Sequence, residues 1–128
     1  MKQALNPSTL FPPFGNYSHG FKAAGQGVLV TSGQLGIAAD GSIPADPGEQ
    51  ARLCMESLAA ILREGGLSFA DVVRLNAFVT DRAHMPAYMR ARDEALAGLA
   101  VKPASTLVIV AGLSRPEFLV EIEATAVY

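Results

Sequence analysis

The sequence predicts an α+β fold in which a mixed sheet carries two helices on one face. Two segments, 46–65 and 85–99, repeat apolar residues at the spacing of one helix face. Apolar and polar residues alternate along 119–127, the pattern of a strand with one buried face. Short apolar runs lie before and between these segments, so the expected order is strand, strand, helix, strand, helix, strand, strand. At 128 residues, the chain 1–128 is expected to form one domain.

The first part of the chain predicts extended structure. Three prolines fall within residues 5–16, which favours an extended lead-in over a helix. Residues 17–23 and 28–32 are expected to be short strands, and the second is closed by the glycine-containing segment 33–36. The Asp40-Gly41 pair then indicates a turn.

The first helix has a clear predicted start and end. Asp46 is expected to be its N-cap, Pro47 its first residue, and Glu49 the second member of a capping box. The pair at 65–66, both glycine, should end it. Cys54 falls within the apolar stripe, so we expect a small buried side chain and not a nucleophile.

Three further strands are expected. Segment 106–110 is apolar on both faces after Thr106, which predicts a central strand covered on both sides. In segment 71–79 the residues expected to face the core are Val73, Leu75, Ala77 and Val79. In segment 119–127 they are Val120, Ile122, Ala124 and Ala126, while Glu121, Glu123 and Thr125 face the other way.

The second helix carries a charge where an aliphatic residue is expected. Arg92 lies in the middle of its apolar stripe, and a buried guanidinium must be paired. Arg92 therefore either serves a functional site or reaches past the helix edge to water or a core carboxylate. Arg90 lies on the outward side of the helix and is expected to be solvated.

Composition excludes several classes of function. The net charge is −2, the isoelectric point is about 5.6, and no run of Lys or Arg exists, so nucleic acid is not an expected partner. One cysteine, no signal-like leader and no apolar run of membrane-spanning length favour a soluble cytoplasmic protein. Two helices on one sheet face leave the other face bare, and few charges are available to coat it. That face is expected to meet other subunits.

The chemical groups suit a small organic ligand. His19 and His84 have no Cys or carboxylate at metal-ligand spacing, so no metal site is expected. No phosphate loop, dinucleotide fingerprint or nucleophile elbow is present. The remaining polar groups favour acid–base chemistry through water on a small polar ligand. They are Tyr17, Ser32-Gly33-Gln34, Arg92, Ser105 and Glu121.

Six short segments, spread over nearly the whole chain, carry a family resemblance. They are Gly15-Asn16-Tyr17-Ser18, Thr31-Ser32-Gly33-Gln34, Gly48-Glu49-Gln50-Ala51, Ala77-Phe78-Val79-Thr80-Asp81, Pro103-Ala104-Ser105-Thr106 and Val120-Glu121-Ile122-Glu123-Ala124. In order and spacing they resemble the RidA/YjgF family. The resemblance implies a chorismate-mutase-like fold, a homotrimer whose sheets form an inner barrel, and ligand clefts between subunits.

The resemblance also implies an activity that needs no cofactor, the hydrolysis of reactive enamines and imines to a keto acid and ammonia. Tyr17, Ser32 and Gly33 would line the cleft, and Glu121 would position the attacking water. Leu107 would offer a backbone amide.

One position departs from the family pattern. The family's carboxylate-binding arginine falls two residues after Pro103, where this chain has Ser105. Losing a charge-assisted contact costs roughly 1.5–3 kcal/mol, about one to two decades in affinity. Our hypothesis is that Arg92, or else Arg90, supplies the cation from the second helix. The ligand would stay acidic but change shape, for example to a larger amino-dienoic acid.

Two alternatives remain open from the sequence. A non-catalytic metabolite-binding or protective protein on the same scaffold is favoured by the missing arginine. The ribonuclease or translation-inhibitor activity attached to this family is disfavoured by the acidic isoelectric point.

Overall fold

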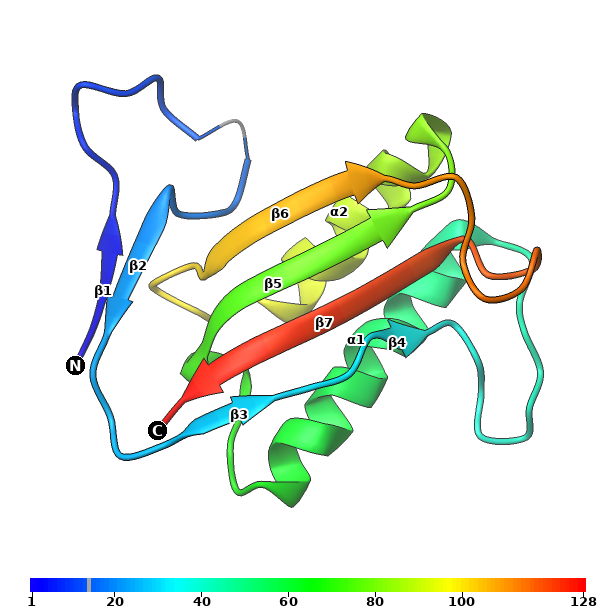
Figure 1. The fold of residues 1–128 in the computed structure, drawn as a ribbon, viewed down its shortest axis with the longest axis horizontal. Helices are drawn as coiled ribbons and strands as arrows, with labels where there is room; N and C mark the ends of the chain where they lie inside the picture. The colour runs from blue at the N-terminus through cyan, green and yellow to red at the C-terminus, as the bar shows by residue number, and fades with distance from the viewer. Residues whose placement is uncertain (14) are drawn as a thin grey trace.

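The computed structural model describes residues 1–13 and 15–128, and it confirms an α+β fold with a mixed sheet and two helices (Figure 1). The five-stranded sheet runs, in spatial order, β3 (Val28–Val30), β7 (Val120–Val127), β5 (Val72–Val79) and β6 (Ala104–Ile109), with β4 (Gln34–Leu35) also paired to β7. A two-stranded sheet contains β1 (Lys2–Leu5) and β2 (Gly20–Ala23). The helices are α1 (Pro47–Glu64), α2 (Met85–Ala95) and the short 3-10 turns η1 (Phe69–Asp71) and η2 (Arg82–His84).

Both α-helices cover the same face of the large sheet (Figure 1). We call the opposite side the open face. Strands β5 and β6 are parallel and joined through α2, while β7 runs antiparallel to β3, β4 and β5. Neither α-helix of the described chain has the length and apolar character needed to cross a membrane.

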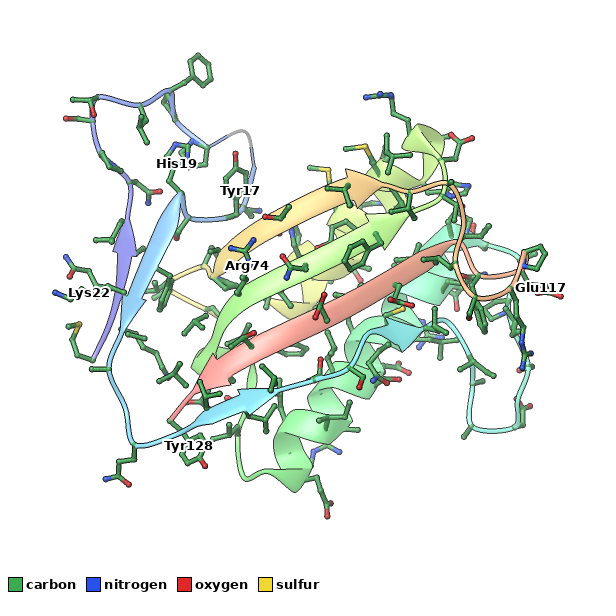
Figure 2. All side chains as sticks on the ribbon, in the orientation of Figure 1. Tyr17, His19, Lys22, Arg74, Glu117 and Tyr128 are labelled. Carbon is green, nitrogen blue, oxygen red and sulfur yellow. The ribbon has the colours of Figure 1, made fainter. Side chains whose placement is uncertain are left out.

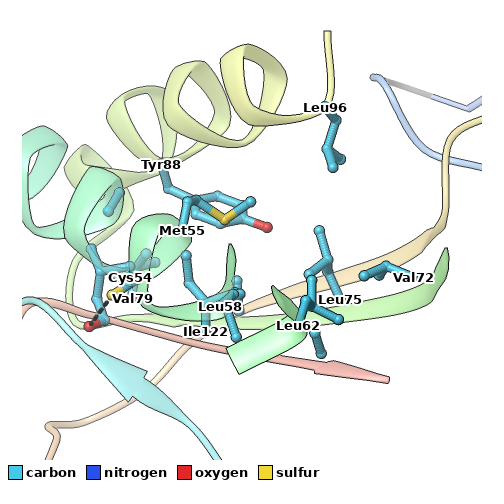
Figure 3. Close-up of a cluster of buried hydrophobic side chains, with 14 of the residues drawn as sticks. Cys54, Met55, Leu58, Leu62, Val72, Leu75, Val79, Tyr88, Leu96 and Ile122 are labelled. Atoms are coloured by element: carbon cyan, nitrogen blue, oxygen red, sulfur yellow. Dashed lines mark hydrogen bonds between the residues drawn. The ribbon is translucent and has the colours of Figure 1, made fainter. Parts of the chain in front are cut away.

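The core lies between the helices and the sheet (Figure 3). The alternation predicted for β7 is confirmed, because its even-numbered residues from Val120 to Ala126 are buried. In β5 the prediction is correct for Leu75, Ala77 and Val79 but wrong for Val73. The pairing with β7 shifts register between Val72 and Arg74, and this irregularity turns Val72 into the core in place of Val73.

The prediction that 106–110 forms a central, doubly covered strand is wrong for the single chain. The strand β6 lies at the edge of the sheet, because it pairs with β5 on one side and has only an isolated bridge, from Ala104 to Ser18, on the other. Val108 and Ile109 are 40% and 42% exposed. The apolar character of this strand therefore exceeds what the single chain buries.

Helix α1 begins and ends where the sequence predicts. The Asp46 carboxylate accepts a hydrogen bond from the Glu49 amide at 2.9 Å, and Pro47 is the first residue. The predicted capping box does not form, since the Glu49 side chain accepts instead from Arg52. The helix ends at Gly65 and Gly66, the second with φ of +74°.

Helix α2 is shorter than the predicted 85–99 and ends at Ala95. The segment that follows leaves the helix by tight turns, and the Lys102 ammonium donates to the carbonyls of Leu96 and Leu99 at 2.6 and 2.9 Å. Leu96 still packs into the core. The helix thus loses its last turn but keeps its buried stripe, which includes Arg92.

The sequence did not predict β1, which pairs with β2 to form a hairpin at the side of the molecule. Lys2 ties this hairpin to the main body through an ion pair with Asp71 (Nζ to Oδ1, 2.8 Å). In the connecting loop, Ser18 donates its amide to Pro103 (3.2 Å) and its hydroxyl to Lys102 (2.6 Å), both backbone carbonyls. These contacts hold the preceding residue, Tyr17, beside the start of β6 (Figure 2).

One polar side chain is built into the core. Gln50 is fully buried on α1, and its amide donates to the carbonyls of Pro44 and Glu117, each at 2.8 Å. Its oxygen accepts from the Leu119 amide at 2.8 Å. These bonds join the loop before α1 to the segment that enters β7.

We expect Gln50→Leu to lower the free energy of unfolding by at least about 3 kcal/mol, because it leaves two carbonyls and one amide unpartnered in the interior. Urea unfolding followed by circular dichroism measures the change. Gln3→Leu, at an exposed position of β1, is the matched control and should change stability by less than about 0.5 kcal/mol. Equal effects of the two substitutions would contradict the role given to Gln50.

Candidate functional site

A pocket of about 260 Å³ lies where α2, β6 and the loop before β2 meet. It is lined by Gly15, Tyr17, Met85, Met89, Arg92, Ser105 and Leu107. Four residues named from the sequence therefore come together here, one from the loop, one from α2 and two from β6. A separate pocket of about 280 Å³ between α1 and α2 contains none of the predicted site residues.

Arg92 is held rigidly in the wall of the pocket. Its side chain is 4% exposed, and its Nε and Nη2 donate to Asp93 Oδ1 at 3.1 and 3.0 Å. Its guanidinium carbon lies 5.7 Å from the centre of the Tyr88 ring, one turn earlier on α2, within the range of a cation–π contact. The guanidinium is thus paired with the partly exposed carboxylate of its neighbour in the sequence, and it also lines the pocket.

Tyr88 places a second polar group next to this wall. Its ring packs in the core, and its hydroxyl has no hydrogen-bond partner among the described residues (Figure 3). Burial raises the pKa of Tyr88, while the nearby Arg92 and Ser105 side chains act in the opposite direction. The Tyr88 hydroxyl thus lies next to Arg92 and Ser105, two of the residues that line the pocket.

Ser105 and Leu107 point toward α2. Their partners in β5 are Leu75 and Ala77, whose side chains lie in the core, so both β6 side chains project from the helix-covered face. The Val110 amide donates to Val79 of β5 at 2.8 Å. Amide direction alternates along a strand, so the amides of the odd-numbered residues of β6, including Leu107, point away from β5 toward the unpaired edge. The amide role implied for Leu107 stays a prediction.

Glu121, Ser32 and Gly33 form a second group away from the pocket. Glu121 lies on β7, opposite Leu35 of β4, and projects from the open face. A Cβ atom at Gly33 would lie 2.5 Å from Glu121 Oε2, so a larger residue there would require the Glu121 side chain to move. Ser32 is exposed beside them. Within one chain, the structure does not bring this group to the pocket, because the two lie on opposite faces of the sheet.

Arg90 lies outside both groups. It is exposed on α2 and does not line the pocket, whereas Arg92 does. Met85 and Met89 do line it, although the sequence predicts them only as packing residues of the helix. Nothing in the sequence separates these two residues from the other apolar residues of the helix stripe.

Neither histidine is among the residues that line the pocket. His19 Nε2 is hydrogen-bonded to the Phe11 carbonyl at 2.6 Å, within the loop that precedes β2. His84 precedes α2, and its Nδ1 is buried without a hydrogen-bond partner in the described chain. Across residues 1–13 and 15–128, no three His, Cys, Asp or Glu side chains are grouped as a metal site requires.

Cys54 is confirmed as a buried structural residue. Its thiol contacts the carbonyls of Gln34 (3.2 Å) and Val120 (3.7 Å). Burial, and secondarily the negative charge of Glu121, raise the pKa of this thiol to about 12. A thiol in this state is not a nucleophile at neutral pH.

Comparisons with known proteins agree on one family. A family model described as endoribonuclease L-PSP matches residues 8–128. The chain is 36% identical over 105 residues to TdcF of Escherichia coli (strain K12), covering 78% of each chain. It is also 36% identical over 103 residues to the 2-iminobutanoate/2-iminopropanoate deaminase of the same strain, covering 78% of this chain and 79% of the relative.

Solved structures extend the likeness to the whole fold. The Rid family protein YyfB from Yersinia pestis superimposes with a TM-score of 0.89 at 32% identity, covering 99% of this chain and 98% of the other. A structure of E. coli TdcF with bound serine gives a TM-score of 0.74 at 29% identity over 98% of each chain.

The environment of Cys54 yields a test. At pH 8 the native thiol should react with a thiol-specific reagent at least about a thousandfold more slowly than in guanidinium chloride, because burial raises the pKa of this thiol to about 12 and so removes the reactive thiolate. Absorbance of the released chromophore measures both rates. The unfolded chain is the control, and a fast native reaction would place the thiol at the surface.

Proposed function

Because the chain belongs to the RidA/YjgF/L-PSP family, we propose that it is a cofactor-free hydrolase that deaminates imines and enamines of small organic acids. In this reaction a water oxygen bonds to the imine carbon while protons pass to the nitrogen. The C–N bond then breaks, giving ammonia and a 2-oxo acid without any oxidant or reductant. The observation that carries the proposal is the convergence of Arg92, Ser105 and Tyr17 on one pocket.

Arg92 is proposed to bind the substrate carboxylate in place of an arginine at position 105. Asp93 accepts from only two of the five N–H donors of Arg92, so the others can donate to a ligand carboxylate. Ser105 adds a hydroxyl on the facing strand. Since guanidinium and hydroxyl lie on rigid elements, the carboxylate would be held in one orientation.

Glu121 is proposed to position the attacking water, with Tyr17, Ser32, Gly33 and the Leu107 amide lining the cleft. In one chain Glu121 lies on the other face of the sheet from the pocket, so this role requires another subunit. We therefore propose a homotrimer in which the Glu121 side of one subunit completes the pocket of the next. The exposed apolar surface of β6 supports such an assembly.

Two other functions have less support. A non-catalytic metabolite-binding protein is consistent with Ser105, but it gives no account of the close packing of Gly33 on Glu121. An endoribonuclease agrees with the description of the family model, but a net charge of −2 provides no electrostatic attraction to RNA.

We expect Arg92→Gln to weaken the binding of 2-oxobutanoate, a stable product analogue, by about 10–100-fold, because a charge-assisted contact to the carboxylate is lost. Isothermal titration calorimetry measures the dissociation constant. Arg90→Gln removes an exposed arginine from the same helix and should leave binding unchanged. If Arg90→Gln weakens binding more than Arg92→Gln does, the carboxylate is bound by Arg90 and the role proposed for Arg92 is wrong.

We expect Glu121→Gln to lower kcat/KM for an imine generated in situ by about 10²–10⁴-fold while leaving 2-oxobutanoate binding intact, since the carboxylate acts on water. The matched control is Glu123→Gln, which changes a carboxylate on the same side of β7, two residues on. Unchanged turnover in Glu121→Gln would exclude the proposed role. Sedimentation of both variants checks that assembly is unaffected.

A further inference from the structure

The pocket has a polar end and an apolar end. Helix α2 runs antiparallel to β6, so its last turn, with Arg92, lies at the Ser105 end of the strand, and its first turn, with Met85, at the Leu107 end (Figure 1). At about 1.5 Å per residue, Met89 lies about 4.5 Å along the helix from Arg92, and Met85 about 10 Å. One end therefore offers a cation and a hydroxyl, and the other offers two thioethers and an isobutyl group.

Gly15 closes the pocket where these two ends meet. A Cβ atom at this position would lie 3.7 Å from both Arg92 Nη2 and Met89 Cε. A ligand held by its carboxylate at Arg92 therefore directs its side chain along Met89 toward Met85. Among the described residues that line that half of the pocket there is no Lys, Arg or His.

Resting on the proposed function, we infer that the preferred substrates are 2-imino monocarboxylic acids with an extended apolar side chain, such as those derived from leucine or methionine. A volume of about 260 Å³ suits a small metabolite of this size. The flexible, polarisable thioethers of Met85 and Met89 adapt to side chains of different shape. The smallest imines leave this wall without contacts.

A second carboxylate does not suit the apolar end. Placing an anion against Met85 and Met89 removes it from water without providing a paired cation, which is unfavourable. The pocket thus disfavours imines derived from glutamate, and also a dicarboxylic amino-dienoic acid as a larger ligand. Met85 and Met89 of α2 would then determine which side chain is preferred, while the imine group reacts at the end of the pocket that holds Arg92 and Ser105.

The test compares four imines generated in situ by amino-acid oxidase from alanine, leucine, methionine and glutamate. Semicarbazide captures the imine that escapes hydrolysis, and absorbance of the semicarbazone gives kcat/KM for each. We expect the leucine and methionine imines to exceed the alanine imine by at least about tenfold, the discrimination typical of missing methylenes in an apolar pocket. The glutamate imine should fall below the alanine imine.

A variant locates the origin of this preference. Met89→Gln keeps the length of the side chain but makes it polar, and should reduce the leucine-to-alanine ratio of kcat/KM by at least about threefold. Glu94→Gln, at an exposed position of α2 outside the pocket, should leave the ratio unchanged.

The outcomes separate the two proposals. If wild type hydrolyses the alanine or glutamate imine as well as the leucine imine, the inferred preference is overturned and the deaminase function stands. If no imine is hydrolysed faster than in buffer, both are overturned. The wild-type series decides the question even if Met89→Gln does not fold.

Discussion

The buried guanidinium of Arg92 is the interaction on which the candidate site depends. A charge almost excluded from water must be compensated, and the partner that the structure provides, Asp93, is itself more than one-third exposed. The Tyr88 ring contributes a further contact without neutralising the charge. Asp93 accepts from two of the five N–H donors of Arg92, which leaves donors of this cation for another group at the pocket beside Ser105. An anionic group in the pocket would complete the pairing.

The order of strands explains why the remaining site residues lie elsewhere. Placing β7 between β5 and β3 buries one face of the C-terminal strand against α1 and turns Glu121 to the open face. The same order leaves β6 at the edge, with Ser105 and Leu107 directed toward α2. One chain thus presents the two halves of the proposed site on opposite sides of one sheet. A second copy is the simplest means of joining them.

Features governed by neighbours in the sequence could be predicted, and features governed by distant pairing could not. The Asp46 cap and the alternation of 119–127 follow from local patterns. The inward turn of Val72 depends on a register shift against β7, and the edge position of β6 depends on which strand enters the sheet beside β5. Arg92 was identifiable because a charge interrupts an apolar stripe. Met89 was not, because an apolar residue lining a pocket has the same pattern as one in the core.

A cation on α2 changes what a ligand must provide. Arg92 already bonds to Asp93, so a carboxylate that binds it gains less than the roughly 1.5–3 kcal/mol of a contact to an otherwise unpaired charge. Burying each methylene contributes about 0.8 kcal/mol. Two or three methylenes against Met85 and Met89 therefore offset the binding free energy that the carboxylate loses because Arg92 is already paired. Affinity in the proposed site would then depend on the side chain of the substrate as much as on its carboxylate. With an unpaired arginine at position 105, the carboxylate alone would supply this affinity, and the substrate would not need an apolar side chain.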